Sequence, residues 1–404
     1  MTSNKLKIIN DPVYGFISIS KPELYDYIQT PYVQRLRRIK QLGLSNLVYP
    51  GAEHTRFSHS IGAMFLMQQA LDVLRSKGEQ ISEEEYLASL LAILLHDTGH
   101  APFSHCLEDF FFGVKHEEIS LQFMRNLNIG KTTIDIFLDK YPKRFLKELV
   151  SSQVDTDRLD YLTRDSFFTG VSEGVIGTDR IIKMFSVNND ELVIDEKGIY
   201  SVEKFIISRR LMYWQVYMHK TVVGADCLLK NILKRAKYLA LQNDLIQNNK
   251  HITEHLLYFL QNGQKTPTDN EALQHFVLLD DTDIWSSVKV WSEHRDKILS
   301  FLSQSLINRE LGHLSIQKNN FSQQDLCDRR KKLMLKYGNT YSMQEITEYF
   351  SANDELHNRA YSFDDSKINI LYKNGEIKEI YEASDQLDKS FLSKFIKKYY
   401  YFEL

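Results

Sequence analysis

Four side chains in three separated segments have the types that bind a divalent metal ion. His59 stands at the start of a run with helical apolar spacing. His96 and Asp97 are adjacent at the end of another such run, and Asp157 lies in a polar segment further along. Two imidazoles and two carboxylates suit Fe, Mn, Zn or Mg and leave coordination positions for water and a substrate oxygen. The sequence therefore predicts a catalytic metal centre made by these four side chains.

The first two of these segments are predicted to be helices that carry the ligands at their ends. His59 falls in the first turn of a helix that begins at Arg56. Ser82 and Glu85 predict a capping box at the start of the helix that ends before His96. This second helix is apolar on all sides and should be buried, where a carboxylate is costly unless a cation or hydrogen bonds compensate it. The alternatives are a core histidine at position 59 and a His-Asp pair that only satisfies loop backbone.

The third segment, residues 154–166, is predicted to be a helix with one polar side. Asp157, Tyr161, Arg164 and Asp165 share that side at helical spacing. A solvated charged surface is the alternative interpretation. The combination with a histidine and a His-Asp pair upstream favours a functional site.

The composition is that of an ordinary globular protein. Of 404 residues, 43% are hydrophobic and 25% are charged, which argues against disordered, collagen-like and disulfide-scaffold classes. The formal net charge is only -3, so a local basic cluster must hold any anionic ligand, and a bulk nucleic-acid binder is disfavoured. Three scattered cysteines, with no signal peptide and no long apolar run, predict a cytoplasmic protein without a membrane partner.

Helices should dominate the fold, because the chain has only 17 Gly and 7 Pro, and apolar residues recur at three- and four-residue spacing. We expect a main helical domain over residues 1–245 and a mixed lobe over residues 246–404. The minor elements expected are a turn and short strand in 7–20, a hairpin in 192–200, one amphipathic helix over 284–306, and a hairpin in 367–383 around Asn374-Gly375.

Seven short motifs extend the pattern of the candidate ligands. They are Gln34-Arg35-Leu36-Arg37, Lys40-Gln41-Leu42-Gly43, Pro50-Gly51-Ala52, Arg56-Phe57-Ser58-His59-Ser60, His96-Asp97-Thr98-Gly99-His100, Pro102-Phe103-Ser104-His105 and Asp157-Arg158-Leu159-Asp160-Tyr161. Together they resemble the HD-domain deoxynucleoside triphosphate triphosphohydrolase family over roughly residues 5–225. The resemblance implies a mainly α fold, with an HD-domain helical core over 1–245, small β-hairpins and a mixed α/β C-terminal lobe.

The same resemblance implies a reaction and roles for individual residues. The family converts a dNTP and water to a deoxynucleoside and triphosphate, through a water activated at the α-phosphorus by a divalent metal ion such as Mn, Fe, Mg, Zn or Ni. His100, His105 and His116 correspond to cleft histidines, and His105, helped by Glu108, is the expected proton donor. The expected substrate contacts are Arg56, Arg158, Arg209 and Lys220 to phosphates, Gln41 and Asp165 to the 3′ hydroxyl, Tyr161 and Tyr217 at C2′, and Leu42 to the base. For His116 and Arg209 the alternative is an ordinary solvated surface position.

Regulation and assembly are expected from the resemblance alone. Lys7, Gln34 and Arg37 correspond to parts of a nucleotide activator site in the family, with Gln29 in place of its base-reading Asp. The alternative is that Lys7 and Arg37 only tie the N-terminal strand to the core. The family also implies a homodimer or homotetramer. Two other functions stay open: an HD phosphatase or phosphodiesterase that acts on another nucleotide, and a noncatalytic nucleotide sensor.

Overall fold

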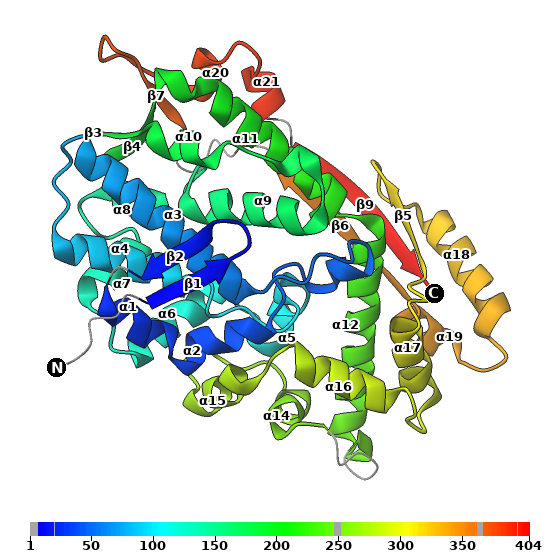
Figure 1. The fold of residues 1–404 in the computed structure, drawn as a ribbon. Helices are drawn as coiled ribbons and strands as arrows, with labels where there is room; N and C mark the ends of the chain where they lie inside the picture. The colour runs from blue at the N-terminus through cyan, green and yellow to red at the C-terminus, as the bar shows by residue number, and fades with distance from the viewer. Residues whose placement is uncertain (1–6, 20, 246–251, 360, 362–366, 394) are drawn as a thin grey trace.

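The computed structural model describes residues 7–19, 21–245, 252–359, 361, 367–393 and 395–404, and the described chain is mainly helical (Figure 1). The N-terminal elements are β1 (Lys7–Asp11), β2 (Gly15–Ile19), α1 (Pro22–Ile28), α2 (Pro31–Gln34), η1 (Arg35–Arg38) and η2 (Gly43–Leu47). The central elements are α3 (Arg56–Ser76), α4 (Glu83–Leu95), η3 (Ser104–Cys106), α5 (Glu108–Phe111), α6 (His116–Asn126), α7 (Lys131–Phe137), α8 (Arg144–Val150), α9 (Thr156–Thr169), η4 (Ser172–Gly174) and α10 (Thr178–Lys183).

The rest of the chain alternates helices with short strands. Before residue 245 these elements are β3 (Phe185–Asn188), β4 (Glu191–Asp195), η5 (Glu196–Gly198), α11 (Ile199–Met212), the π-helical turn η6 (Tyr213–Tyr217) and α12 (Lys220–Leu241). After it they are α14 (Glu254–Asn262), α15 (Asn270–Leu278), α16 (Asp281–Trp291), α17 (Lys297–Ile307), β5 (His313–Gln317), α18 (Gln323–Tyr337), α19 (Met343–Tyr349), β6 (Ser351–Arg359), β7 (Asn369–Leu371), β8 (Ile377–Glu379), α20 (Ile380–Ala383), α21 (Lys389–Leu392) and β9 (Phe395–Glu403).

Side-chain caps fix the starts of the three helices that carry the candidate ligands. Thr55 accepts from the amide of Ser58 at the start of α3. The predicted capping box is confirmed, because Ser82 and Glu85 bond reciprocally at the start of α4. Asp155 caps α9. Such caps satisfy backbone N–H groups that a helix leaves unpaired, so each helix begins at a defined residue.

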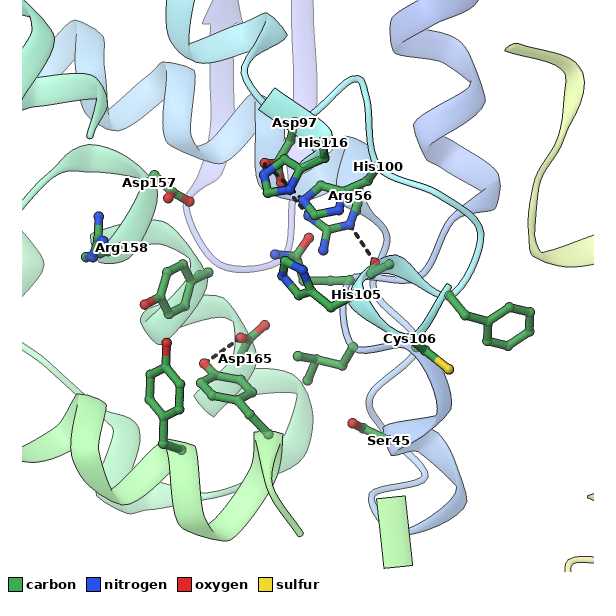
Figure 2. Close-up of a pocket in the computed structure, with 18 of the residues that line it drawn as sticks. Ser45, Arg56, Asp97, His100, His105, Cys106, His116, Asp157, Arg158 and Asp165 are labelled. Atoms are coloured by element: carbon green, nitrogen blue, oxygen red, sulfur yellow. Dashed lines mark hydrogen bonds and ion pairs between the residues drawn. The ribbon is translucent and has the colours of Figure 1, made fainter. Parts of the chain in front are cut away.

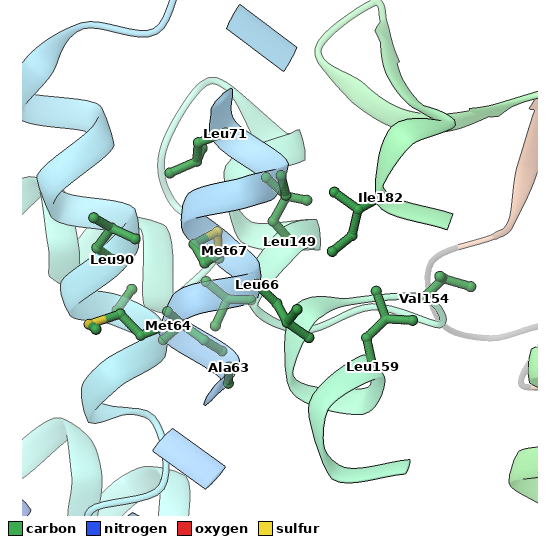
Figure 3. Close-up of a cluster of buried hydrophobic side chains, with 14 of the residues drawn as sticks. Ala63, Met64, Leu66, Met67, Leu71, Leu90, Leu149, Val154, Leu159 and Ile182 are labelled. Carbon is green, nitrogen blue, oxygen red and sulfur yellow. The ribbon is translucent and has the colours of Figure 1, made fainter. Parts of the chain in front are cut away.

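A buried apolar cluster holds these helices together. In Figure 3, Leu66 and Met67 of α3 lie among Leu90 of α4, Leu149 of α8 and Leu159 of α9. α3 and α9 approach so closely that a Cβ on Gly62 would lie 2.1 Å from an Asp160 carboxylate oxygen. Only glycine fits at that crossing, which brings together two of the helices that carry candidate ligands.

Three small antiparallel or mixed sheets complete the fold. β1 and β2 form a hairpin, so the predicted strand in 7–20 has a partner, β1, that the sequence did not predict. The second sheet has the order β3-β4-β7-β8, with β4 parallel to β7, and the third has the order β5-β9-β6. In Figure 1 the second and third sheets lie at different ends of the molecule. The predicted hairpin in 367–383 is confirmed as β7 and β8, with Gly375 at φ +84° in the turn.

Two local predictions were wrong. A hairpin was expected within 192–200, but β4 pairs with β3, which precedes it. Asn189 and Asp190 both take positive φ and make the tight turn between these strands. Ile199 begins α11 instead of a second strand. The single helix expected over 284–306 is two helices, because Asp296 caps a new start for α17.

The domain boundary near residue 245 stays a prediction. Within the described residues, no helix combines the length and the apolarity needed to cross a membrane.

Candidate active site

A cleft of about 380 Å³ lies where α3, α9, α11 and α12 meet the loop after α4. Its volume falls in the range of small-molecule sites. Most of the side chains singled out from the sequence line it: Gln41, Leu42, Arg56, Asp97, His100, His105, His116, Asp157, Arg158, Tyr161, Asp165, Arg209 and Tyr217. Ser45, Phe103, Tyr213 and Asp226 line it as well, without having been predicted.

The four candidate metal ligands converge at one end of this cleft. His59 Nε2 lies 3.1 Å from Asp157 Oδ1 and 3.7 Å from Asp97 Oδ2. His96 Nε2 lies 3.2 Å from Asp97 Oδ1 and 3.5 Å from Asp157 Oδ1. The residues come from α3, from the end of α4 and from α9, so the fold brings together groups separated by about a hundred residues.

The donor set fits a divalent cation. Both Nε2 atoms are buried, and neither has a hydrogen-bond partner among the described residues. His59 Nδ1 lies 2.8 Å from Asp160 Oδ2, and His96 Nδ1 lies 2.6 Å from the Ile93 carbonyl oxygen. Because these partners only accept, each neutral ring carries its proton on Nδ1 and offers the Nε2 lone pair to a metal. The metal group His59, His96 and Asp157 has ligand atoms within 4.8 Å of one another.

The electrostatics of the cluster favour positive charge at the same point. Burial alone would lower the pKa of His59, but the Asp157 and Asp160 carboxylates outweigh it and raise that pKa to about 10. Burial likewise opposes charge on His96, and Asp97 and Asp157 raise its pKa. A cation held by the Nε2 atoms would take the place of those protons.

Asp97 connects the ligand cluster to the histidines of the cleft. Its Oδ2 is paired with the Arg56 guanidinium, and Arg56 Nε donates to Ser104 Oγ at 2.7 Å. His100 Nε2 lies 3.3 Å from Asp97 Oδ1, and His116 Nε2 lies 3.7 Å from it. Arg56, expected on the α-phosphate, is therefore held at the cleft wall by the carboxylate of Asp97, a candidate ligand, as Figure 2 shows.

Glu108 organises the candidate proton donor. It accepts from His116 Nδ1 and the His116 amide at 2.7 Å each, and its other oxygen lies 3.1 Å from His105 Nδ1. Burial would raise the pKa of Glu108, but these histidine contacts hold it far below its ordinary value. The rings of His100 and His116 stack with centroids 3.7 Å apart, and burial with the charge of Arg56 lowers the pKa of His100. His105 is the exposed member, with 69% of its side chain accessible.

The candidate phosphate contacts differ in where they lie. Arg158 faces the histidines across the cleft in Figure 2 and is ion-paired with Asp155. Arg209 also lines the cleft and donates to Gln153 at 3.5 Å. Lys220, the first residue of α12, is exposed and is not among the described residues that line the cleft.

The candidate sugar contacts form a linked group. Tyr217 donates its hydroxyl to Asp165 Oδ2 at 2.7 Å, and His54 Nε2 lies 2.7 Å from Asp165 Oδ1. The rings of Tyr161 and Tyr217 meet edge to face at 6.2 Å. Burial and the Asp165 charge raise the pKa of Tyr217, so this hydroxyl stays a donor.

The three candidate activator residues lie outside the cleft lining. Lys7 Nζ lies 4.8 Å from the Tyr25 ring, Arg37 lies over the Phe57 ring, and Arg37 Nε donates to Gln34 Oε1 at 3.0 Å. These contacts join β1, α1, α2 and α3, which is also what the simpler tethering interpretation requires.

Several residues that hold the site were not predicted as site residues. Asp160 accepts from His59 and from Arg164 Nε and Nη2, and Arg164 Nη1 donates to Asp11 at 2.7 Å. The sequence did contain a signal for Asp160 and Arg164, since Asp160 follows Asp157 by three residues and precedes Arg164 by four on one helix. The roles of Asp11 and His54 had no local signal.

Known proteins share both the sequence and the fold. Residues 56–164 match the HD domain, and residues 176–255 match the HD associated region. The uncharacterized protein YwfO of Bacillus subtilis is 37% identical over 322 residues, which cover 76% of this chain and 71% of YwfO. Human deoxynucleoside triphosphate triphosphohydrolase SAMHD1 is 29% identical over 282 residues, 57% of this chain and 45% of SAMHD1, so the match spans less than half of that relative.

A crystal structure of a phosphohydrolase from Bacteroides thetaiotaomicron superposes with a TM-score of 0.93 at 49% identity, and the match covers 99% of this chain and 100% of that one. The alignment thus covers the cleft, its histidines and the lobe after residue 245 together. The HD-domain match contains all four convergent His and Asp residues. This chain is therefore a hydrolase and belongs to the HD-domain phosphohydrolase family.

Proposed function

We propose that this hydrolase splits deoxynucleoside triphosphates into deoxynucleoside and triphosphate. The observation that carries the proposal is the layout of one cleft: a His-Asp cluster suited to a divalent metal at one end and the Asp165–Tyr217 pair at the other. A relative named as a dNTP triphosphohydrolase supports the choice of substrate. The metal would be held by His59, His96, Asp97 and Asp157. When bound, a divalent metal lowers the pKa of water and draws charge from a phosphate oxygen.

The chain's own cations hold the triphosphate in this proposal. Arg158 and Arg209 line the cleft, and Lys220 is an exposed residue at the start of α12, a helix that also contributes to the cleft wall. Guanidinium groups bind phosphate oxygens through paired, charge-assisted hydrogen bonds. Arg56 neutralises Asp97 and contacts the α-phosphate from the same wall.

The leaving 5′ oxygen of the sugar needs a proton, and His105 supplies it. Its Nδ1 lies 3.1 Å from a Glu108 carboxylate oxygen, which leaves Nε2 to donate to the leaving oxygen in the cleft. His100 and His116 complete a polar wall that orients the phosphate. The 5′ oxygen and the proton thus leave together as the deoxynucleoside hydroxyl.

Selection for deoxyribose follows from the sugar end. Asp165 and Gln41 bind the 3′ hydroxyl, while the rings of Tyr161 and Tyr217 fill the space at C2′. Leu42 gives the base only an apolar contact, which discriminates weakly between bases. We also propose that the protein forms a homodimer or homotetramer and that a nucleotide at Lys7, Gln34 and Arg37 activates it.

The test is product analysis with purified protein, Mn²⁺ or another divalent metal, and each dNTP in turn. Anion exchange and ³¹P NMR should detect inorganic triphosphate and a deoxynucleoside, and ¹⁸O from water should appear in the triphosphate. Asp157→Ala should abolish the reaction and bound metal together, whereas Asp328→Ala, an exposed acid on α18, should change neither. Pyrophosphate or orthophosphate as the only product would instead indicate a phosphatase or phosphodiesterase, and no turnover would indicate a sensor.

A further inference from the structure

The loop that carries His105 has an unusual backbone. Phe103 and Ser104 both take positive φ, at 56° and 53°. Non-glycine residues rarely adopt this region, so surrounding contacts must hold it. Ser104 Oγ accepts from Arg56 Nε at 2.7 Å and lies 3.2 Å from the Lys40 carbonyl oxygen, to which it donates. The conformation of this loop therefore sets where Arg56 and His105 lie.

One carboxylate from the C-terminal half of the chain holds this loop. Asp281 Oδ1 accepts from the Phe103 amide at 2.8 Å, and Oδ2 accepts from the Lys40 amide at 2.9 Å. Asp281 is buried, with 4% of the residue exposed. Lys40 directly precedes Gln41 and Leu42, so one side chain bridges the segment expected to contact sugar and base and the segment expected to donate the proton.

The Asp281 carboxylate is not needed to start its own helix. Asp280 is the N-cap of α16 and accepts from the Thr282 amide at 2.8 Å, and Asp283 completes the capping box. A cap that is already satisfied gains nothing from a further acid in the first turn beyond a small dipole effect. Both Asp281 oxygens instead accept hydrogen bonds from the two cleft segments.

Two arginines contact the connection between α15 and α16, and one of them also contacts the loop after α4. Arg35 Nη2 donates to the Leu279 carbonyl at 3.0 Å, and Nη1 donates to the carbonyls of Thr98 at 3.1 Å and His100 at 2.8 Å. Arg38 is ion-paired with Asp280. Arg35 thus links the α15–α16 connection to the backbone at Thr98 and His100, while Asp281 contacts the same loop directly at Phe103. This connection lies outside residues 56–164 and 176–255, which match the HD domain and its associated region.

We propose that Asp281 is a positioning residue of the active site, which sets the spacing between the Gln41–Leu42 segment and the Ser104–His105 segment. This assigns part of the C-terminal half of the chain to the cleft, and it rests on the proposed function for its kinetic consequence. Asp281 is not among the described residues that line the cleft, so it acts through the two backbone segments.

The test compares Asp281→Asn with Asp283→Asn. Asparagine keeps the shape but can accept through only one atom, so one of the two backbone bonds is lost. Asp281→Asn should lower kcat for dNTP hydrolysis by about tenfold to a hundredfold, with KM and bound metal within about twofold. Asp283→Asn changes an acid on the same turn that bonds to neither cleft segment, and it should keep kcat within about twofold, whatever its effect on Tm.

Hydrogen exchange separates this inference from the proposed function. In Asp281→Asn, peptides covering residues 38–42 and 98–106 should exchange faster than in the wild type and in Asp283→Asn. Equal kcat and equal exchange in the two variants would overturn the proposal, even if the wild type hydrolyses dNTPs. If the wild type has no dNTP activity, exchange alone decides. If Asp281→Asn does not fold, the wild-type amides of Lys40 and Phe103 must still be as protected as those within α16, and rapid exchange there would refute the bridge.

Discussion

Asp160→Asn should weaken metal binding without unfolding the protein. Asp160 is fully buried, and its carboxylate joins His59 Nδ1 at 2.8 Å to Arg164 Nε and Nη2 at 2.9 Å each. An asparagine can accept through one atom only, so it cannot serve both His59 and the Arg164 fork. Arg164 would still be paired with Asp11, so the substitution leaves no unpaired buried charge, and the protein should stay folded.

The expected loss of metal affinity follows from the contact of Asp160 with His59 Nδ1, because His59 is a candidate metal ligand. Loss of such a contact lowers metal affinity about 10- to 100-fold. At a free metal concentration about 100 times the wild-type Kd, binding should add about 2.7 kcal/mol to the free energy of unfolding of the wild type. In Asp160→Asn the same concentration should add only about 1.4 to about 0.4 kcal/mol.

The assay is chelator competition together with thermal unfolding across a metal titration. Asp155→Asn is the matched control, because it also replaces a buried carboxylate at α9. Asp155 is paired with Arg158 rather than with a candidate metal ligand. It should keep metal affinity within about twofold. A folded Asp160→Asn protein that binds metal as tightly as the wild type would refute the orienting role of Asp160.

Three further outcomes are expected. Gly62→Ala should destabilise the protein by about 1–3 kcal/mol in urea unfolding, because the new Cβ would lie 2.1 Å from the buried Asp160 carboxylate. Tyr217→Phe should raise KM for dNTPs about 3- to 10-fold in steady-state kinetics, because the hydroxyl that orients Asp165 is lost. Burial raises the pKa of Asp226 from 3.8 to about 7, so the stability linked to its protonation is fully present below pH 3.8 and is lost as the pH rises through about 7. The wild type should therefore lose about 3–4 kcal/mol relative to Asp226→Asn between pH 4 and pH 8 in urea titrations, and a constant difference would contradict this.

Local signals predicted the elements that carry the ligands. Ser82 and Glu85 placed the start of α4 correctly, and the apolar run after them ended at His96 as expected. These signals work because helix caps and helical periodicity involve residues within one or two turns. The predicted turn at Asn374-Gly375 is confirmed for the same reason, since positive φ at Gly375 is a property of a few adjacent residues.

Contacts between distant segments escaped prediction. His54 and Asp165 are 111 positions apart, and Asp281 reaches Phe103 across 178 positions and Lys40 across 241. No local spacing encodes such a pair, because an acidic residue at a helix start has an ordinary local role as well. The hairpin predicted in 192–200 was wrong for a different reason: Asn189 and Asp190 tolerate positive φ, and they place the turn before residue 192.

Charge in the centre of the molecule is the strongest physical reason to expect a divalent ion there. Asp97 and Asp157 face His59 and His96, and behind them Asp160 and Asp11 belong to the same connected network. Two guanidiniums, from Arg56 and Arg164, offset two of these four carboxylates. With neutral imidazoles the network keeps two more negative than positive charges, and Asp157, which pairs with no guanidinium among the described residues, lies where the two Nε2 atoms meet. Buried charge on this scale is unfavourable unless it is matched, and a single divalent cation matches it while using the lone pairs that no protein donor satisfies.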